Sequence, residues 1–276
     1  MKNLSLGFSS CPNDTYIFYG LVRGKVPLPG FTFHEYVHDV EQLNRMVERR
    51  ELDVSKVSIH GVLHMLGDYA LLRSGAALGR GVGPLIVARP GKKLENLAQG
   101  VVGAPGEYTT AKLLLDLYSD RPLTVNHMVF DQIMPSLARG DIDYGVIIHE
   151  GRFTYQSYGL TSLLDLGSWW EKETGLPLPL GGIVIKRSLG KETAEKVEEA
   201  IRESIFFTRE HLDQAWDYIR SYAQEMDPDV IQSHIDLYVN EETIRLSEEG
   251  EKAIYTLFDM AREKKQLASG DQPIFL

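Results

Sequence analysis

Short apolar runs recur along the first two-thirds of the chain and are separated by segments of mixed polarity. Runs of this length that are rich in β-branched and aromatic residues are typical of β-strands. The pattern predicts strands over Leu4–Phe8, Phe31–Tyr36, Val54–Val57, Leu85–Ala88, Val101–Gly103, Thr124–Met128, Tyr144–Ile148 and Gly182–Lys186.

Apolar positions three and four residues apart predict helices between these strands and throughout the last third of the chain. The apolar faces are Val40, Leu43, Met46 and Val47; Ala111, Leu114, Leu115 and Tyr118; Val197, Ile201, Ile205 and Leu212; and Ala253, Ile254, Leu257, Phe258 and Ala261. Alternation of strands and helices is typical of βαβ units on a mostly parallel sheet. The sequence therefore predicts an α/β fold with a helical C-terminal segment.

Two stretches rich in glycine and proline, Gly79–Lys93 and Thr174–Gly190, indicate where the chain passes between two domains. A chain of 276 residues is long for one domain and suits two of modest size. We therefore expect a larger discontinuous α/β lobe made of residues 1–91 and 187–276 and a smaller inserted α/β lobe made of residues 92–186. A small-molecule ligand would bind in the cleft between them.

Composition narrows the class of protein. The formal charge of −10 argues against a nucleic-acid partner, which normally requires a basic surface. No apolar run is long enough to predict a membrane span, and the first residues carry no apolar core of a secretory signal. The single cysteine excludes an internal disulfide framework and a multi-cysteine metal site. Together these features favour a cytoplasmic protein.

Three predicted strand-to-helix turns carry hydroxyl or amide side chains. They are Ser9, Ser10, Asn13 and Thr15 in the first turn, Ser55 and Ser58 in the second, and Thr109 and Thr110 in the third. Ligands of open α/β sheets bind beyond the carboxyl ends of strands, where helix N-termini attract anions. We expect Ser58, Thr109 and Thr110 to line one cleft and to contact a carboxylate or another oxygen-rich anion. Helix capping alone also accounts for hydroxyl residues at such turns.

His149 directly follows the predicted strand Tyr144–Ile148 and should therefore lie at the carboxyl end of that strand, beside the cleft. Histidine is the side chain best suited to proton transfer near neutral pH, with an ordinary pKa near 6–7. A hydrogen-bonded structural histidine fits the same position.

Two histidine motifs resemble zinc sites, and neither is expected to bind metal. HEYVH spans His34–His38, but its alternating pattern predicts a strand, which would place the two histidines roughly 13 Å apart. HGVLH, at His60–His64, has helical spacing but lacks a glutamate base and a third ligand.

Several stretches, in order along nearly the whole chain, resemble the 1,4-dihydroxy-6-naphthoate synthase family of menaquinone biosynthesis. They are LGFSSCPNDTYIFYGLV, SKVSIHGV, LRSGAALGRGVGPLIVAR, GEYTTA, IIHEGRFTY, DLGSWWEKETGLPLPLG and YVNEETIRLSEEGEKA. Short pieces such as CPND would be weak signals alone, but the ordered set is specific. The resemblance implies a two-lobed fold of the type II periplasmic-binding-protein-like class, with two inter-lobe crossings.

The resemblance also implies a reaction. It is a lyase step in which cyclic dehypoxanthine futalosine loses a proton and a ribose-derived fragment to give 1,4-dihydroxy-6-naphthoate. By resemblance, His149 is the catalytic base, and the substrate contacts are Lys56, Val57, Ser58, Thr109 and Thr110. The partner implied is a small-molecule carboxylate substrate, and no metal or organic cofactor is implied.

Further candidates for the substrate cleft are Ser10, Asn13, Arg80, Arg152 and Tyr155. The chain departs from the family pattern at Gly151, where serine is frequent, and at Glu107, which adds a negative charge beside the Thr109-Thr110 turn. Two other functions remain open. One is a non-catalytic small-anion binding protein of the same fold, and the other is the related chorismate dehydratase.

Overall fold

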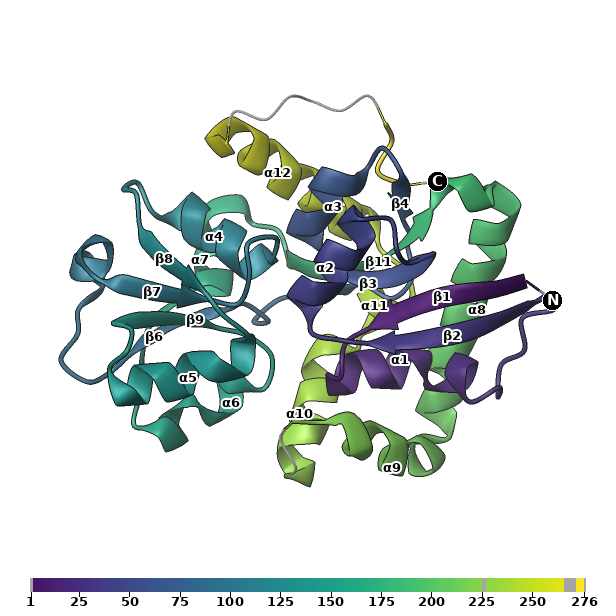
Figure 1. Ribbon diagram of the computed structural model, residues 1–276, viewed down its shortest axis with the longest axis horizontal. Helices are drawn as coiled ribbons and strands as arrows, with labels where there is room; N and C mark the ends of the chain where they lie inside the picture. Colours follow the sequence, from purple (N-terminus) through teal and green to yellow (C-terminus); the bar gives the residue numbers. More distant parts are fainter. Residues whose placement is uncertain (1, 225–226, 266–271, 276) are drawn as a thin grey trace.

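The computed structural model describes residues 2–224, 227–265 and 272–275. Within these residues the chain forms two β-sheets, each with helices on both faces (Figure 1). The first sheet has the order β2-β1-β3-β11-β4, with β5 paired to β11. Its strands are β1 (Lys2–Phe8), β2 (Phe31–Val37), β3 (Val54–Ser58), β4 (Tyr69–Leu71), β5 (Ala77–Gly79) and β11 (Leu178–Lys186).

The second sheet has the order β10-β6-β9-β7-β8. Its strands are β6 (Leu85–Ala88), β7 (Val101–Ala104), β8 (Thr124–His127), β9 (Tyr144–Ile147) and β10 (Thr161–Asp165). Helices α4 and α7 lie on one side of this sheet, and α5 and α6 lie on the other (Figure 1).

The helices up to the last strand are α1 (Pro12–Val22), α2 (Val40–Glu48), α3 (Ile59–Met65), α4 (Thr110–Tyr118), α5 (Phe130–Arg139), α6 (Gly151–Thr154) and α7 (Leu166–Thr174). Those that follow are α8 (Lys191–Glu210), α9 (Leu212–Tyr222), α10 (Pro228–Tyr238), α11 (Glu241–Ile244) and α12 (Glu248–Lys265). The predicted helical C-terminal segment is thus confirmed for the described residues. None of the helices described is both long and apolar enough to cross a membrane.

Each predicted strand is present with ends shifted by a few residues, but the prediction of a mostly parallel sheet is wrong. The pairs β1–β2, β1–β3, β7–β8 and β7–β9 are parallel. The long strand β11 is antiparallel to β3, β4 and β5, and β6 is antiparallel to β9 and β10. Each sheet is therefore mixed, because the strands that follow a crossing run against the parallel set.

Sheet membership differs from the lobe boundaries predicted at 91/92 and 186/187. Strand β6 belongs to the second sheet, although residues 85–88 were assigned to the larger lobe. Strand β11 belongs to the first sheet, although residues 178–186 were assigned to the inserted lobe. We propose that each sheet defines one lobe, with crossings at residues 80–84 and 175–177. The glycines and prolines there precede β6 and β11. They mark the crossing itself, and each of these strands belongs to the sheet that the chain enters after the crossing.

Apolar side chains fill both faces of the first sheet. Leu4, Leu6 and Phe8 point from β1 toward α1 and α8. Ile183 of β11 belongs to the same apolar cluster. Val184, the next residue of β11, points to the opposite face. This alternation is the two-residue period of a strand buried on both sides.

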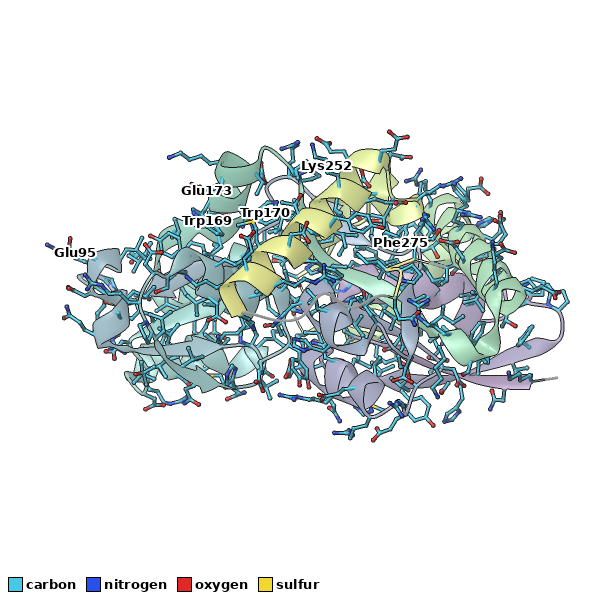
Figure 2. All side chains as sticks on the ribbon, turned by 90° about the horizontal axis from the view of Figure 1, so that it is seen from above. Glu95, Trp169, Trp170, Glu173, Lys252 and Phe275 are labelled. Atoms are coloured by element: carbon cyan, nitrogen blue, oxygen red, sulfur yellow. The ribbon has the colours of Figure 1, made fainter. Side chains whose placement is uncertain are left out.

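Helix α7 anchors the second crossing. Trp170 is fully buried, and its Nε1 donates to the carbonyl oxygen of Pro177 at 3.0 Å. Trp169 meets the Tyr118 ring edge to face at 5.8 Å between ring centroids. Figure 2 shows both indoles on the lobe that holds α7, with Phe275 on the other lobe. The crossing is thus fixed to the second lobe by an indole hydrogen bond.

We expect Gly83→Ala to destabilise the fold by about 2 kcal/mol or more, the upper range for overpacking. A Cβ atom at Gly83 would lie 2.2 Å from the Cα atom of Gly167 at the start of α7. Backbone cannot swing aside as a flexible side chain can. Urea unfolding measures the effect, with Gly67→Ala as the matched control because a Cβ there meets nothing within 4 Å. Equal unfolding midpoints for the two variants would contradict this prediction.

Candidate active site between the two sheets

A cavity of about 80 Å³ lies between the two sheets. Its wall is formed by Ser9, Asn13, Asp14, Val40, Lys56, Val57, Ser58, Ala77, Val82, Pro84, Thr109, Thr110, Ala111, Ile148, His149, Leu180, Gly181 and Tyr238. Ligand pockets are usually larger, at ~300–1,000 Å³. We infer that the lobes move apart to admit a ligand.

The cavity brings together predicted site residues from four separate parts of the chain. Asn13 comes from α1, and Lys56, Val57 and Ser58 come from β3. The remaining three are Thr109 and Thr110, at the N-terminus of α4, and His149, beyond the end of β9. The strand-end and helix-start positions inferred from the sequence thus meet in one place.

Two predicted cleft arginines, Arg80 and Arg152, are not part of the cavity wall. Arg80 donates from Nη2 to the carbonyl of Gly175 and to Glu249, each at 3.0 Å. Arg152 forms an ion pair with Asp165 at 2.6 Å. Each guanidinium group also has a carbonyl partner at a crossing, Gly175 for Arg80 and Gly83 for Arg152, so they brace the connection between the lobes instead of facing the cavity.

Ser10 and Tyr155 also lie outside the cavity wall. Tyr155 instead packs against the apolar cluster beneath α5. In the predicted hydroxyl turns, Thr15 and Ser55 are buried and donate to backbone carbonyls of their own turns. These hydroxyls serve local structure through bonds to nearby backbone carbonyls.

A buried ion pair forms the floor of the cavity. Asp14 is 3% exposed and Lys56 is 4% exposed, and their charged atoms are 3.0 Å apart. The carboxylate of Asp14 also accepts from the Ser9 hydroxyl at 2.7 Å and from the side-chain amide of Asn13 at 2.9 Å. Lys56 donates further to the carbonyl of Gly75 at 3.0 Å. Both charges are therefore compensated before any ligand binds.

The first turn of α4 forms a second side of the cavity. The hydroxyl of Thr109 caps the helix by accepting from the backbone N–H of Lys112 at 3.2 Å. The hydroxyl of Thr110 donates to the carbonyl of Leu180 at 2.7 Å and accepts from the backbone N–H of His60 at 3.2 Å. These contacts engage the hydroxyls, whereas the first N–H groups of a helix have no intrahelical partner. An anion at this end would bind mainly to the backbone of α4.

His149 stands beside the cavity in a backbone conformation that is unusual for a residue other than glycine. Its φ is +54°, in the left-handed region, which costs on the order of 1–2 kcal/mol for most residues. Such conformations persist where surrounding structure imposes them, and they cluster at functional sites. The turn aims the imidazole into the cavity and does not continue β9.

Burial lowers the pKa of His149 to about 4, while the nearby Asp14 raises it and Lys56 lowers it. The expectation of an ordinary histidine pKa is therefore wrong. The physical cause is desolvation, because the surrounding protein disfavours the charged imidazolium. At neutral pH the imidazole is uncharged and able to accept a proton.

Residues of α2 hold the loop before α4, and this contact joins the two lobes. Arg45 pairs with Glu107 at 2.6 Å and lies 4.0 Å above the Tyr108 ring. The backbone N–H of Tyr108 donates to Glu41 at 3.0 Å, and its hydroxyl donates to Glu48 at 2.6 Å. The Arg45 guanidinium lowers the pKa of Glu107, so this carboxylate is charged and neutralised by a partner. These five residues form one polar contact between the lobes.

Sequence reasoning missed two polar wall residues, Asp14 and Tyr238. Asp14 sits directly after Asn13 in a turn already chosen for its polar side chains, so its carboxylate could have been found. Tyr238 ends α10 on the buried face, and its hydroxyl donates to the carbonyl of Val82 at 3.3 Å. Nothing local distinguishes Tyr238 from a core aromatic residue.

The two histidine motifs do not form a metal site within the part of the chain that the structure describes. His34 lies on the strand β2, which fits the predicted extended conformation. His60 and His64 lie on α3 with ring centroids 5.2 Å apart, and Nδ1 of His60 bonds the carbonyl of Thr109. No group of three histidine, cysteine, aspartate or glutamate side chains in the described ranges is placed to hold a metal ion.

Two mixed sheets joined by two crossings, with a cavity between them, define the periplasmic-binding-protein-like class of fold. The alkanesulfonate-binding protein from Xanthomonas axonopodis pv. citri matches with a TM-score of 0.74 at 12% identity, over 98% of this chain and 95% of that chain. A Candida albicans protein described as having the generic periplasmic binding protein fold matches with a TM-score of 0.70 at 12% identity, over 98% of this chain and 92% of that chain. Both likenesses concern the fold alone.

Within this class, the chain belongs to the menaquinone biosynthesis family, whose family model matches residues 4–263. A relative from Thermus thermophilus, named 1,4-dihydroxy-6-naphtoate synthase, is 45% identical over the whole of both chains. A relative of the same name from Streptomyces coelicolor is 43% identical over 94% of this chain and 92% of its own. A solved protein from Archaeoglobus fulgidus has a TM-score of 0.90 and 34% identity, covering 96% of this chain and 98% of its own.

Proposed function

We propose that the protein catalyses the 1,4-dihydroxy-6-naphthoate synthase reaction, converting cyclic dehypoxanthine futalosine to 1,4-dihydroxy-6-naphthoate. Family membership and full-length similarity to two relatives of that name support this assignment. The structural observation that carries it is an uncharged histidine, His149, at the wall of a closed cavity. A proton abstraction that starts a lyase reaction requires such a group.

In the proposed mechanism His149 removes a proton from the bound substrate. The ribose-derived fragment then leaves, and formation of the aromatic ring drives the reaction forward. General-base catalysis typically supplies about 10²–10⁴-fold in rate. Orientation of the substrate and exclusion of water in the closed cavity supply further acceleration.

Binding of the substrate carboxylate is assigned to the first turn of α4, at Thr109 and Thr110. Backbone N–H groups and the positive end of the helix dipole favour an anion there. Ser58 lies on the facing wall, where Asn44 donates to its hydroxyl at 3.2 Å. Lys56 would act through its positive field, because its ammonium group is held by Asp14 and Gly75.

Incubation of the purified protein with cyclic dehypoxanthine futalosine tests the proposed function. Appearance of 1,4-dihydroxy-6-naphthoate is the expected result. Binding without turnover would favour a non-catalytic binding protein. Turnover of chorismate to 3-enolpyruvyl-benzoate, with the futalosine derivative left intact, would instead identify a chorismate dehydratase.

We expect kcat/KM to rise with pH through a value near 4 and then to stay level through neutrality. The free enzyme requires neutral His149, and burial lowers the pKa of this residue to about 4, so the neutral fraction grows as the pH rises through that value. A pH–rate profile measures the effect, and a limb centred at 6–7 would contradict it.

Loss of kcat/KM through acid unfolding has to be distinguished from loss through protonation of His149. Burial also lowers the pKa of His60, to about 3, so the unfolded chain binds protons more readily than the folded one at both histidines. Their contribution to stability is complete above the unfolded histidine pKa of ~6.5 and declines as the pH falls below it. Circular dichroism at each pH shows whether lost rate reflects protonation of the base or loss of the fold.

A further inference from the structure

We propose that His234, in the C-terminal helices, is a positioning residue for His149, which rests on the proposed role of His149 as the base. His234 lies on α10 of the first lobe, and its ring centroid is 6.2 Å from that of His149, with 26° between the ring planes. Phe130, at the start of α5 in the second lobe, contacts the imidazole of His149 edge to face, with 5.1 Å between the ring centroids and 70° between the ring planes. The imidazole of His149 therefore has an aromatic neighbour from each lobe.

The position of His234 is fixed by a hydrogen bond. Its side chain is fully buried, and Nε2 lies 2.9 Å from Oδ1 of Asn13. The amide nitrogen of Asn13 donates to the Asp14 carboxylate at 2.9 Å, which identifies the other amide atom as the oxygen. An amide oxygen only accepts, so Nε2 of His234 carries the proton and donates.

The hydrogen bond of His234 is the outer link of a chain of donors that ends on Asp14. His234 donates to Asn13, Asn13 donates to Asp14, and Lys56 and the Ser9 hydroxyl donate to the same carboxylate. Every member of this chain except Lys56 and its ion-pair partner is neutral. The buried charges therefore hold Asn13 in one orientation, and Asn13 fixes the tautomer of His234.

His234 remains neutral in this environment. Burial lowers its pKa well below the ordinary value, and the neighbouring His149 and Lys56 lower it further. The groups that act on His149 are Asp14 and Asp39, which raise its pKa, and Lys56, which lowers it. A neutral ring beside His149 does not compete for the abstracted proton.

The contact between the two histidines joins the two lobes. His149 belongs to the lobe of the second sheet, whereas α10 packs on α1 and β5 of the first. Closing the lobes would therefore bring His234 beside the base, with 6.2 Å between the two ring centroids. Substrate-induced closure would then both enclose the substrate and orient the base.

His234→Ala tests the proposal, with His211→Ala as the matched control. His211 lies between α8 and α9, and its ring stacks on Phe207 and bonds the Phe207 carbonyl, whereas the ring of His234 is paired with that of His149. We expect His234→Ala to lower kcat about tenfold or more, a fraction of the full general-base contribution, with KM changed less than about threefold. The control should stay within about twofold of the parent protein.

A second readout needs no turnover. NMR titration of the His149 imidazole should show its pKa rising from about 4 by more than about one unit in His234→Ala, because water enters where the ring was. A purely structural role would lower the unfolding temperature and leave this pKa unchanged. If kcat and the His149 pKa both match those of the control, the proposal is overturned, whether or not the proposed reaction is correct.

His234→Phe covers the case in which the alanine variant does not fold. It preserves ring volume but leaves Oδ1 of Asn13 without its donor, so the ring loses its anchor. We expect kcat to fall at least about fivefold relative to His211→Phe, with KM nearly unchanged. Equal kcat values for the two phenylalanine variants would overturn the proposal. A parent protein that fails to turn over the futalosine derivative would overturn the proposed function, and the NMR titration would still decide the contact between the two histidines.

Discussion

Substitution of His149 by asparagine is expected to lower kcat by roughly 10² or more, the scale for loss of a general base. The fold should remain intact. Asparagine is among the few residues that tolerate the left-handed backbone region, so it suits the φ of +54° at this position. Substrate binding should be largely kept, because α4 and β3 form the binding walls. Steady-state kinetics with cyclic dehypoxanthine futalosine measures the split between kcat and KM.

His127→Asn provides the matched control for this substitution. His127 ends β8, which is separated from β9 by β7 in the same sheet, but its side chain is exposed and outside the cavity wall. Its variant should turn over substrate at the parent rate. A His149→Asn enzyme within a few-fold of the parent would show that the histidine is structural, and Lys56 would become the next candidate for the base.

Lys56→Met is expected to destabilise the protein by about 3–5 kcal/mol, the range for removing one partner of a buried ion pair. The Asp14 carboxylate would keep its bonds from Ser9 and Asn13 but would lose its only cation within ion-pair distance among the described residues. An uncompensated buried charge is the dominant penalty. Chemical denaturation of the variant and of the parent protein gives the difference directly.

Two further variants distinguish a charge effect from loss of packing. Lys56→Met combined with Asp14→Asn removes both charges and should recover most of the lost stability. Lys186→Met breaks a partly exposed pair with Asp53 on the same sheet and should cost about 1 kcal/mol or less. If the double variant is no more stable than Lys56→Met, the buried charge is not the cause.

The sequence predicted the site best where a short apolar run ended on a polar residue. The run Tyr144–Ile148 placed His149 at a strand end, and the structure puts that residue at the cavity wall because strands of one sheet end along a common edge. The same logic located Ser58 and Thr110, which follow or end strands and begin helices. Local pattern is sufficient there, because the end of an element fixes the position of the next side chain.

Strand direction and the choice of ion-pair partner could not be predicted. Hydrophobic periodicity gives the span of β11 but not its direction, so its antiparallel pairing was unforeseen. Arg152 was a candidate for the substrate cleft, yet its guanidinium binds Asp165, which lies on a strand that the sequence pattern did not predict. Such pairings depend on which distant carboxylate the fold brings near.

His234 shows the same limit most clearly. It lies on the apolar face of α10 with Ile231 and Ile235, where the sequence pattern indicates an ordinary core residue. Its relation to Asn13 and His149 arises only when α10 packs beside α1, and those residues lie far apart in the chain. No local pattern carries that information.

The single cysteine of the chain offers a test of the lobe opening inferred above. Cys11 caps α1 beside the cavity, is 3% exposed, and has a thiol pKa raised by burial and by Glu150 of the other lobe. A water-soluble thiol-reactive dye therefore reaches it only when the lobes part and the thiol can ionise. The rate of dye attachment would time that opening in the unaltered protein, and a bound product analogue would slow it.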